Sequence, residues 1–335
     1  MQIADLLGRW RAAGATPVHE QRLLRAWAAG LPLDAHARAG HRQLPRALRA
    51  ALPEFEDALA AMARVHSRHA GSDGERLLVA LADGRSVESV LLPRGGLCVS
   101  TQVGCAVGCS FCMTGRGGLE RQLGSAEIVA QVALARRLRA VTKVVLMGMG
   151  EPAHNLDAVL AAIELLGTAG GIGHKSLVFS TVGDLRAFER LPLARVRPAL
   201  ALSLHTTKAA LRARLLPRAP PIAPAELVRR ALDYADATGY ALQVQWTLIE
   251  GVNDGGDEID GLAAWLAGRR AVLNLIPFNP IDASPFRRPP WEQAAAMARA
   301  LHRRGVLAKL RRSAAQEVDG ACGQLRARRL AAAPG

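Results

Sequence analysis

The feature of this sequence that most constrains its fold is the alternation of strand and helix patterns after Gly96. Amphipathic helical stretches such as SAEIVAQVALARRLRA and PWEQAAAMARALHRRG separate short apolar runs. Those runs are LCVST, KVVLMGM, SLVFST, ALALSLH, LQVQWTLI, AVLNLIPF and VLAKLRR. The alternation predicts an α/β protein with a parallel sheet and helices packed outside it. Periodicity leaves an open doubly wound sheet and a partial barrel as alternatives. In both, the working face lies at the carboxyl ends of the strands.

The chain before Gly96 shows two other patterns. Residues 1 to about 65 carry apolar positions at helical spacing, broken by Gly and Pro. After the turn cluster HAGSDG, the stretch RLLVALADGRSVESVLLP predicts two strands joined by ADG. The predicted domains are an N-terminal helical accessory domain over 1–70, a β-hairpin extension over 71–95, a core over 96–326 and a tail over 327–335.

Composition narrows the class of protein. No stretch approaches the roughly 18–20 apolar residues of a membrane span, and the amino terminus lacks the pattern of a secretory signal, which favours a cytoplasmic protein. The net charge is +14, with 43 basic and 29 acidic residues, and nearly all the basic residues are arginine. Arginine clusters suit a polyanion such as RNA, although biased composition and solvated helix faces explain them equally well. Aromatic residues make up only 4%, which argues against a base-stacking surface of the usual aromatic kind.

Four of the five cysteines lie between Cys98 and Cys112, and the fifth is Cys322. In a reducing compartment such clustering indicates metal binding or catalysis rather than structural disulfides. Cys105, Cys109 and Cys112 have the spacing C-x3-C-x2-C, without the second pair of ligands that a zinc ribbon requires. Three thiolates on a [4Fe–4S] cubane leave one iron free to bind a reacting ligand. Three unrelated buried cysteines are the structural alternative.

The spacing, with Phe111 before Cys112, resembles the signature of radical S-adenosylmethionine (SAM) enzymes. Further motifs occur in the order seen in the RlmN/Cfr family of radical SAM adenine methyltransferases, which act on large-subunit ribosomal RNA. They are LCVSTQVGCAVGCSFC, GGLERQLGSAEIVAQV, VLMGMGEP, ALSLH, GVND, NLIPFNP and ACGQL, and they cover roughly residues 86–326. The resemblance implies a partial (β/α)6-type radical SAM barrel, a [4Fe–4S] cluster held by the three cysteines, and SAM. It also implies that the small helical domain helps to bind RNA.

The resemblance also implies a cysteine relay. Adenine C2 is electron-poor and does not attack the SAM methyl group in a polar displacement, so a carbon radical must add to it. Cleavage of SAM supplies the radical. In the resembled family one SAM methylates a cysteine, here Cys322, and the methyl carbon then adds to the base. Glu88 has the place of the proton acceptor, and Cys98 that of the thiol that releases the product through a transient disulfide with Cys322. From residue pattern alone, Cys98 reads as a core residue and Glu88 as an exposed strand residue.

The remaining predicted residues bind SAM at the strand ends. Gly150 and Glu151 follow a strand in MGMGEP, where backbone and carboxylate meet the SAM ammonium group. By family position the pocket is completed by Ser180, Ser203, Leu204, His205 and Asn279. Ordinary strand-end capping is the alternative for the two serines, and a satisfied interior residue is the alternative for the histidine.

The match departs from the family before Cys322, where Ala314, Ala315 and Gln316 replace the usual residues and Gly320 replaces an alanine. The predicted reaction is methylation of C2 of an adenosine in 23S ribosomal RNA near the peptidyl transferase centre. Transfer RNA is considered as a second substrate and flavodoxin as an electron donor. Methylation of C8 is the nearest alternative. A radical SAM activase or mutase, which has no use for Cys98 and Cys322, and a non-enzymatic RNA-binding module are more distant ones.

Overall fold

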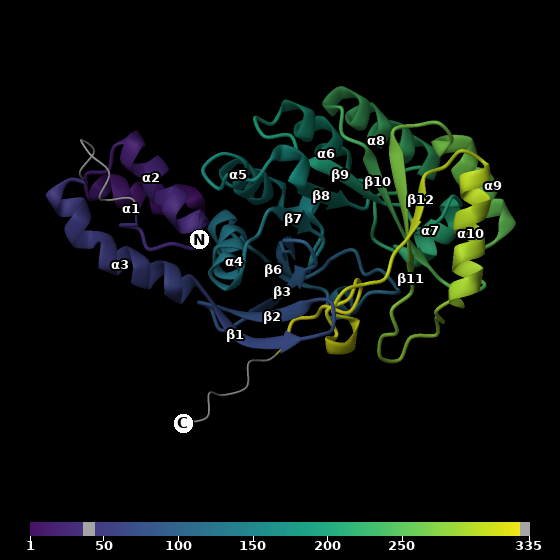
Figure 1. The fold of residues 1–335 in the computed structure, drawn as a ribbon, viewed down its shortest axis with the longest axis horizontal. Helices are drawn as coiled ribbons and strands as arrows, with labels where there is room; N and C mark the ends of the chain where they lie inside the picture. The colour runs from purple at the N-terminus through teal and green to yellow at the C-terminus, as the bar shows by residue number, and fades with distance from the viewer. Residues whose placement is uncertain (36–43, 329–335) are drawn as a thin grey trace.

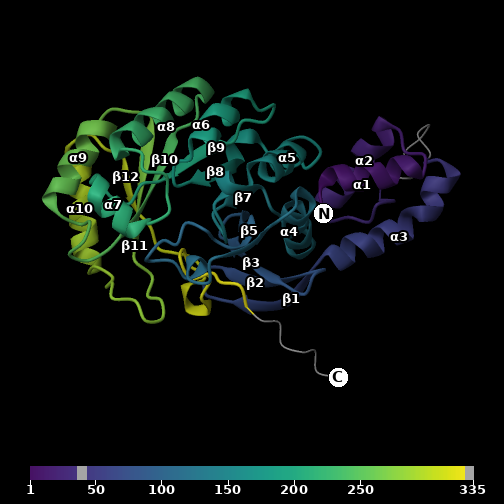
Figure 2. The same ribbon diagram turned by 180° about the vertical axis from the view of Figure 1, so that it is seen from behind.

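The computed structural model describes residues 1–35 and 44–328. A curved mixed sheet forms the centre of the molecule, and the helices α4, α5, α8, α9 and α10 lie along its outer face (Figures 1 and 2). Three N-terminal helices project from one end, beside α4. A doubly wound sheet would carry helices on both faces, so this arrangement is that of a partial barrel.

The described residues form ten α-helices: α1 (Ile3–Ala12), α2 (Pro17–Ala28), α3 (Arg46–Met62), α4 (Ser125–Leu138), α5 (Leu156–Gly167), α6 (Leu185–Arg190), α7 (Ala209–Leu215), α8 (Pro224–Thr238), α9 (Gly256–Leu266) and α10 (Trp291–Arg303). The strands are β1 (Ala63–Ala70), β2 (Glu75–Leu81), β3 (Ser86–Leu92), β4 (Gly96–Cys98), β5 (Gln102–Gly104), β6 (Leu119–Gln122), β7 (Lys143–Leu146), β8 (Leu177–Thr181), β9 (Ala199–Ser203), β10 (Leu242–Leu248), β11 (Ala271–Pro277) and β12 (Ala308–Leu310).

The large sheet has the strand order β1-β2-β3-β4-β7-β8-β9-β10-β11-β12. The seven strands from β4 to β12 pair in parallel, whereas β1, β2 and β3 extend the sheet antiparallel at the β4 edge. Strands β5 and β6 form a separate hairpin. Each strand predicted after Gly96 is present. The predicted α/β fold with a partial barrel and an N-terminal helical part is confirmed.

Two local predictions before Gly96 need correction. The helical segment ends at Met62 rather than at about residue 65, because Ala63–Ala70 form β1 and pair with β2. Helix α3 also runs without a break through Pro53. Its apolar side chains, which include Leu48, Leu52 and Phe55, are buried along one face, and this packing outweighs the lost backbone hydrogen bond.

The predicted β-hairpin is present as β2 and β3, with Leu81 N–H donating to Arg85 O across the turn. The domain boundaries themselves stay predictions, and residues 329–335 of the predicted tail lie outside the described residues. Helix α1 meets the barrel through Ile3 N–H, which donates to Ser125 Oγ at the start of α4 (2.8 Å). Within the described ranges, no helix has the length and apolar character to cross a membrane.

The C-terminal segment, residues 313–328, crosses from the β12 edge of the sheet to the β2–β3 hairpin (Figure 1). At the turn between β1 and β2, Asp73 Oδ1 accepts from Ala315 N–H (2.9 Å) and Glu317 accepts from Ser72. Further along, Ser86 Oγ donates to Arg328 O (2.6 Å). The segment therefore closes over the strand ends, where the predicted site residues lie.

Candidate active site

The three predicted cluster cysteines lie in the loop that joins β5 to β6. Burial, together with the neighbouring thiols, raises the pKa of the Cys105 thiol to about 12 and that of Cys109 well above its usual value. Backbone N–H groups of Val107 and Gly108 donate toward the Cys105 sulfur. Apolar side chains of Phe111, Leu211, Leu215 and Phe278 belong to the cluster packed around these thiols. The loop thus gathers three thiols in a largely apolar shell.

This donor set fits an iron–sulfur cluster better than a single metal ion. In residues 1–35 and 44–328, no three Cys, His, Asp or Glu side chains are close enough to hold one ion. A cubane spaces its thiolates more widely than one ion does, and amide N–H donors stabilise thiolate ligands. Cys105, Cys109 and Cys112 would therefore hold a [4Fe–4S] cluster and leave one iron free for SAM.

Cys322 lies beside both Cys112 and Cys98. Met113 N–H donates to Gly323 O (2.7 Å), which fastens the Cys322 segment to the cluster loop. Cys322 is exposed, yet desolvation by the surrounding protein and, to a smaller extent, the Cys112 thiol raise the pKa of its thiol to about 11.

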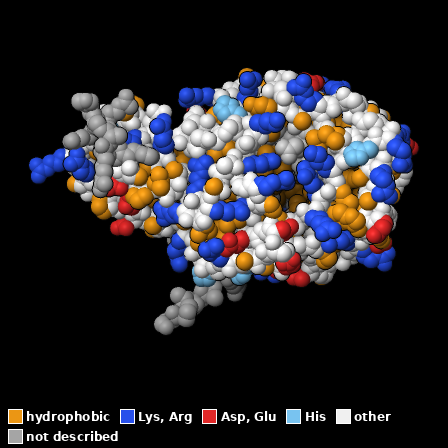
Figure 3. Space-filling view, viewed as in Figure 1, with side chains coloured by type: hydrophobic (Ala, Val, Ile, Leu, Met, Phe, Trp, Pro, Cys, Tyr) orange, Lys and Arg blue, Asp and Glu red, His pale blue; other side chains and the backbone are white. Residues whose placement is uncertain are grey.

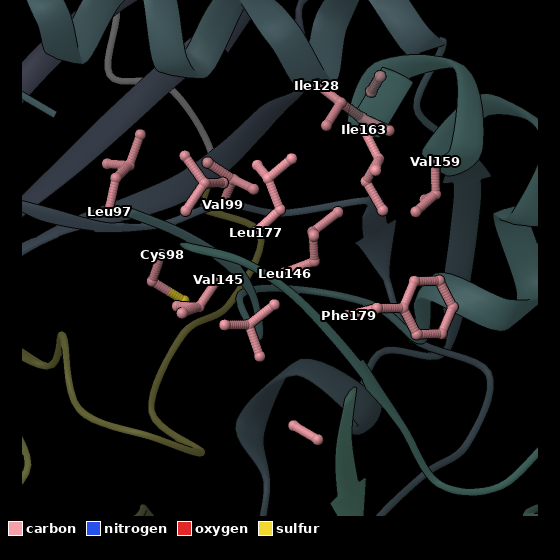
Figure 4. Close-up of a cluster of buried hydrophobic side chains, with 14 of the residues drawn as sticks. Leu97, Cys98, Val99, Ile128, Val145, Leu146, Val159, Ile163, Leu177 and Phe179 are labelled. Atoms are coloured by element: carbon pink, nitrogen blue, oxygen red, sulfur yellow. The ribbon is translucent and has the colours of Figure 1, made fainter. Parts of the chain in front are cut away.

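Cys98 ends β4, and its side chain lies on the opposite side of the strand from Leu97 and Val99, near Val145 (Figure 4). The thiol is buried, which raises its pKa to about 12, and Cys322 contributes to that rise. All five cysteines are free thiols. The structure therefore brings together the two cysteines that the sequence separates by more than 200 residues.

Glu88 is fully buried on β3, which corrects the reading from residue pattern as an exposed strand residue. In the antiparallel register Val90 lies opposite Cys98, and Glu88 shares the face of Val90 because side chains alternate along a strand. The Glu88 carboxylate accepts from the Arg76 guanidinium, from Arg328 Nε (2.7 Å) and from Arg326 N–H (2.8 Å). The predicted proton acceptor thus lies on the Cys98 side of the sheet, engaged with the C-terminal segment.

Glu151 is buried just after β7. Its Oε1 accepts from Ala153 N–H (3.1 Å) and its Oε2 from Val182 N–H (3.0 Å). Burial nevertheless raises the pKa of this carboxyl to about 7. The preceding Gly150 has φ of 103°, and a Cβ there would lie 2.6 Å from the Cβ of Gln102. Only glycine fits this turn, so Gly150 and Glu151 are fixed at the strand end.

The other predicted SAM residues follow neighbouring strands. Ser180 and Ser203 lie at the ends of β8 and β9 with their Oγ atoms 3.5 Å apart, and Leu204 is fully buried. His205 has φ of 65°, and its Nδ1 accepts from Thr247 N–H (2.9 Å). Burial lowers the pKa of His205 to about 3, so the ring is neutral and Nε2 carries the proton. The ring packs edge-on against Phe111 in the cluster loop, with 4.8 Å between centroids.

Asn279, after β11, lies next to the Cys322 segment. Its Nδ2 donates to Ser313 Oγ and to Cys322 O, both at 2.9 Å, and its Oδ1 accepts from Arg288 (2.7 Å). Glu151, Ser180, Ser203 and Asn279 therefore follow four different strands at the same edge of the sheet. Their individual roles, and those of Glu88, Cys98 and Cys322, stay predictions.

Arg212 is a site residue that sequence reasoning missed. It is buried on α7 and donates to the carbonyls of Val182 and Ser203. Burial lowers the pKa of its guanidinium to about 10, while Cys109 and Glu151 act to raise it. The Arg212 Nε atom has no hydrogen-bond partner among the described residues. The positive charge of Arg212 therefore offsets the negative charge of the nearby carboxylate and thiolate. The sequence around it, LRARLLPR, has the pattern of an exposed basic helix, so nothing in it marked Arg212 as a site residue.

The raised pKa of Glu151 predicts a pH-dependent stability. Its folded-state pKa of about 7 exceeds the unfolded value of 4.5, so its contribution is fully present below pH 4.5 and is lost as pH rises through 7. Between pH 5 and 8, the wild type should lose on the order of 2–3 kcal/mol more than Glu151→Gln. Anaerobic denaturant titrations of both proteins across this range measure the difference. Parallel pH profiles would contradict it.

Comparison with known proteins identifies the family. Residues 99–266 match the radical SAM superfamily. The chain is 69% identical to a probable RNA methyltransferase of Methylibium petroleiphilum, over 99% of this chain and 95% of that protein. It is 66% identical to one of Aromatoleum aromaticum, over 99% and 94%. A crystal structure of a radical SAM methyltransferase from Sphaerobacter thermophilus is 34% identical, with a TM-score of 0.83 over 97% of this chain and 98% of that one. The predicted cofactors, a [4Fe–4S] cluster and SAM, are those of this superfamily.

Proposed function

Because the chain belongs to the radical SAM superfamily, we propose that it methylates C2 of an adenosine in 23S ribosomal RNA through a methyl-cysteine intermediate. The observation that carries the proposal is that the Cys322 thiol is near enough to both thiols for Cys112 to raise its pKa and for Cys322 to raise the pKa of the buried Cys98. An activase or mutase has no need of such a pair. The names of the RNA methyltransferase relatives support RNA as the substrate class.

In the proposed reaction each residue has a separate role. Held by Cys105, Cys109 and Cys112, the cluster would supply the electron that cleaves SAM to a 5′-deoxyadenosyl radical. Cys322 carries a methyl group taken from one SAM, and its carbon, after loss of a hydrogen atom to that radical, bonds to the base. Glu88 would take the proton that leaves C2, while the unpaired electron of the adduct would pass to an external one-electron acceptor. The Cys98 thiolate would then attack the Cys322 sulfur and break its bond to the methylene carbon, which takes up a proton. The products are the methylated RNA and a Cys98–Cys322 disulfide, which an external reductant returns to the thiols. Glu151, Ser180, Ser203, His205 and Asn279 position SAM at the strand ends.

The charge distribution supports a polyanionic substrate. Lys and Arg side chains are spread over the face seen in Figure 3 and surround a hollow near its middle, whereas Asp and Glu side chains gather at its lower edge. The helical accessory domain would extend the RNA contact beside α4. Transfer RNA as a second substrate, flavodoxin as electron donor and a cytoplasmic location stay predictions.

The test uses the anaerobically reconstituted protein with SAM, a reductant and in vitro transcribed 23S ribosomal RNA. We expect 2-methyladenosine in the digested RNA and an added methyl mass on the Cys322 peptide, both absent with Cys112→Ala. If the product is 8-methyladenosine instead, the enzyme methylates C8 and the proposed position C2 is wrong. Unmodified RNA and unmodified Cys322, in protein that cleaves SAM, would overturn it.

A further inference from the structure

A hollow of about 560 Å³ lies beside the Cys322 segment and is lined by residues that follow β11 and β12. Such a volume is typical of small-molecule sites. Asn279 and Ser313 line it, and the side chain of Asn279 donates to Cys322 O (2.9 Å). The hollow is thus lined in part by the segment that carries the reacting thiol, and one side chain, that of Asn279, links it to the backbone of Cys322. Of the predicted SAM residues, Asn279 alone lines it.

Three arginines give the hollow a positive wall: Arg288, Arg311 and Arg312. Arg288 is held by Phe278 O and Asn279 Oδ1, both at 2.7 Å, and Arg311 Nε donates to Asn274 Oδ1 (2.8 Å). These partners are neutral, and within the part of the chain described here none of the three pairs with a carboxylate. By contrast, the adjacent Arg287 pairs with Glu250 (2.9 Å).

The opposite wall is acidic but already engaged. Asp73 accepts from Ala315 N–H (2.9 Å), and Glu317 accepts from the backbone N–H and hydroxyl of Ser72 (3.0 and 2.7 Å). These two carboxylates hold the C-terminal segment against the turn between β1 and β2. They repel a phosphate from their own side, so an anion in the hollow would be held at the arginine wall.

A flat stacking surface lies at the same wall. The guanidinium of Arg312 lies over the ring of Trp291, 5.0 Å from its centroid, and Trp291 is 41% exposed at the start of α10. Unpaired RNA bases stack on aromatic rings and on arginine planes. A phosphate site and a stacking surface in one hollow match the two parts of a nucleotide.

We propose that this hollow binds an unpaired nucleotide of the RNA substrate next to the adenosine that is methylated. Its phosphate pairs with Arg288 and Arg311, and its base stacks on the Trp291–Arg312 pair. The inference rests on the proposed function, because it takes the substrate to be RNA that reaches Cys322. It assigns a binding and positioning role to residues outside the cysteine relay.

The test compares Trp291→Leu and Arg311→Gln with the control Arg229→Gln, which removes an exposed arginine paired with Glu226 and Asp233 on α8. The probe is in vitro transcribed 23S ribosomal RNA. We expect Trp291→Leu to raise KM about 10-fold with little change in kcat. The association constant for RNA falls as the salt concentration rises. We expect Arg311→Gln to make the slope of log K against log salt less steep by about 0.7, and we expect the control to match the wild type.

Methylation of Cys322 without RNA is measured in every variant as a check on cofactor binding. We expect it to be unchanged. Loss of that methylation in Trp291→Leu or Arg311→Gln would assign the hollow to SAM and overturn the proposal, as would RNA binding equal to that of the control. Wild-type protein that binds but never methylates RNA would instead overturn the proposed function, while the binding data would still test the hollow.

Discussion

Replacing Cys322 with alanine is expected to abolish RNA methylation while SAM cleavage continues. The substitution removes the atom that carries the methyl group, so no other contact can compensate for it. The cluster ligands are untouched, and Gly323 O, which accepts from Met113 N–H, stays in place. Product RNA and 5′-deoxyadenosine are measured in the same anaerobic reaction, with Cys322→Ser as a second variant. Methylated RNA from either variant would contradict the relay and favour an enzyme that passes its radical directly to the substrate.

Replacing Cys98 with alanine is expected to give a different failure. Cys322 can still take up the methyl group and bond to the base, but no thiol is present to attack its sulfur. The variant should therefore stop after one turnover as a protein–RNA adduct that survives denaturation and thiol reductants, because a thioether links the two. Gel electrophoresis with labelled RNA detects the adduct, and the double variant Cys98→Ala, Cys322→Ala should lack it. Normal turnover by Cys98→Ala would exclude this cysteine as the resolving thiol.

The parts of this molecule that were predictable from sequence have local patterns. Each parallel strand is an apolar run between amphipathic helices, and three cysteines within eight residues make a metal site visible without any fold. Because parallel strands end at one edge of the sheet, the strand-end residues Glu151, Ser180 and Ser203 were also expected to converge. The family resemblance added Cys322, whose own surroundings in sequence are only small and flexible residues.

The parts that escaped prediction depend on contacts between distant residues. Arg76 and Arg328 reach Glu88 from positions 12 and 240 residues away, and neither has a local pattern that distinguishes it from other arginines. Arg212 could not be predicted either, because its local sequence does not distinguish it from other arginines. Strand β1 follows directly after a helix, and only its pairing with β2 reveals it.

The departure from the family before Cys322 also becomes intelligible only in three dimensions. Ala315 and Asp319 both have positive φ, at 54° and 55°, so the backbone turns sharply on either side of a short helix at Gln316–Val318. A Cβ at Gly320 would lie 2.7 Å from the Cβ of Ala315. The glycine that replaces the usual alanine is therefore required by the altered loop that precedes it.

Glu88→Gln is expected to lower the free energy of unfolding by about 3–5 kcal/mol, because it leaves the buried guanidinium of Arg76 without its charge partner. Asp282→Asn is the matched control. It breaks the exposed pair with Arg326, in which Asp282 is 79% exposed, and should cost less than about 1 kcal/mol. Anaerobic denaturant unfolding compares the two variants with the wild type. Equal losses in the two variants would show that the Glu88 network adds nothing beyond a surface pair.

The variant Arg328→Gln distinguishes the role of Glu88 as a proton acceptor from its role in holding the C-terminal segment. Three donors now engage the carboxylate, and two of them, Arg328 Nε and Arg326 N–H, belong to the segment that carries Cys322. Arg76 and Arg328 both donate to Oε1, whereas among the described residues Oε2 accepts only from Arg326 N–H, so Oε2 keeps a lone pair that can take the C2 proton. Arg328→Gln should therefore loosen the segment, seen as faster proteolysis between residues 313 and 328, yet still methylate RNA. Glu88→Gln should lose methylation even where it is folded, since an amide cannot accept the proton.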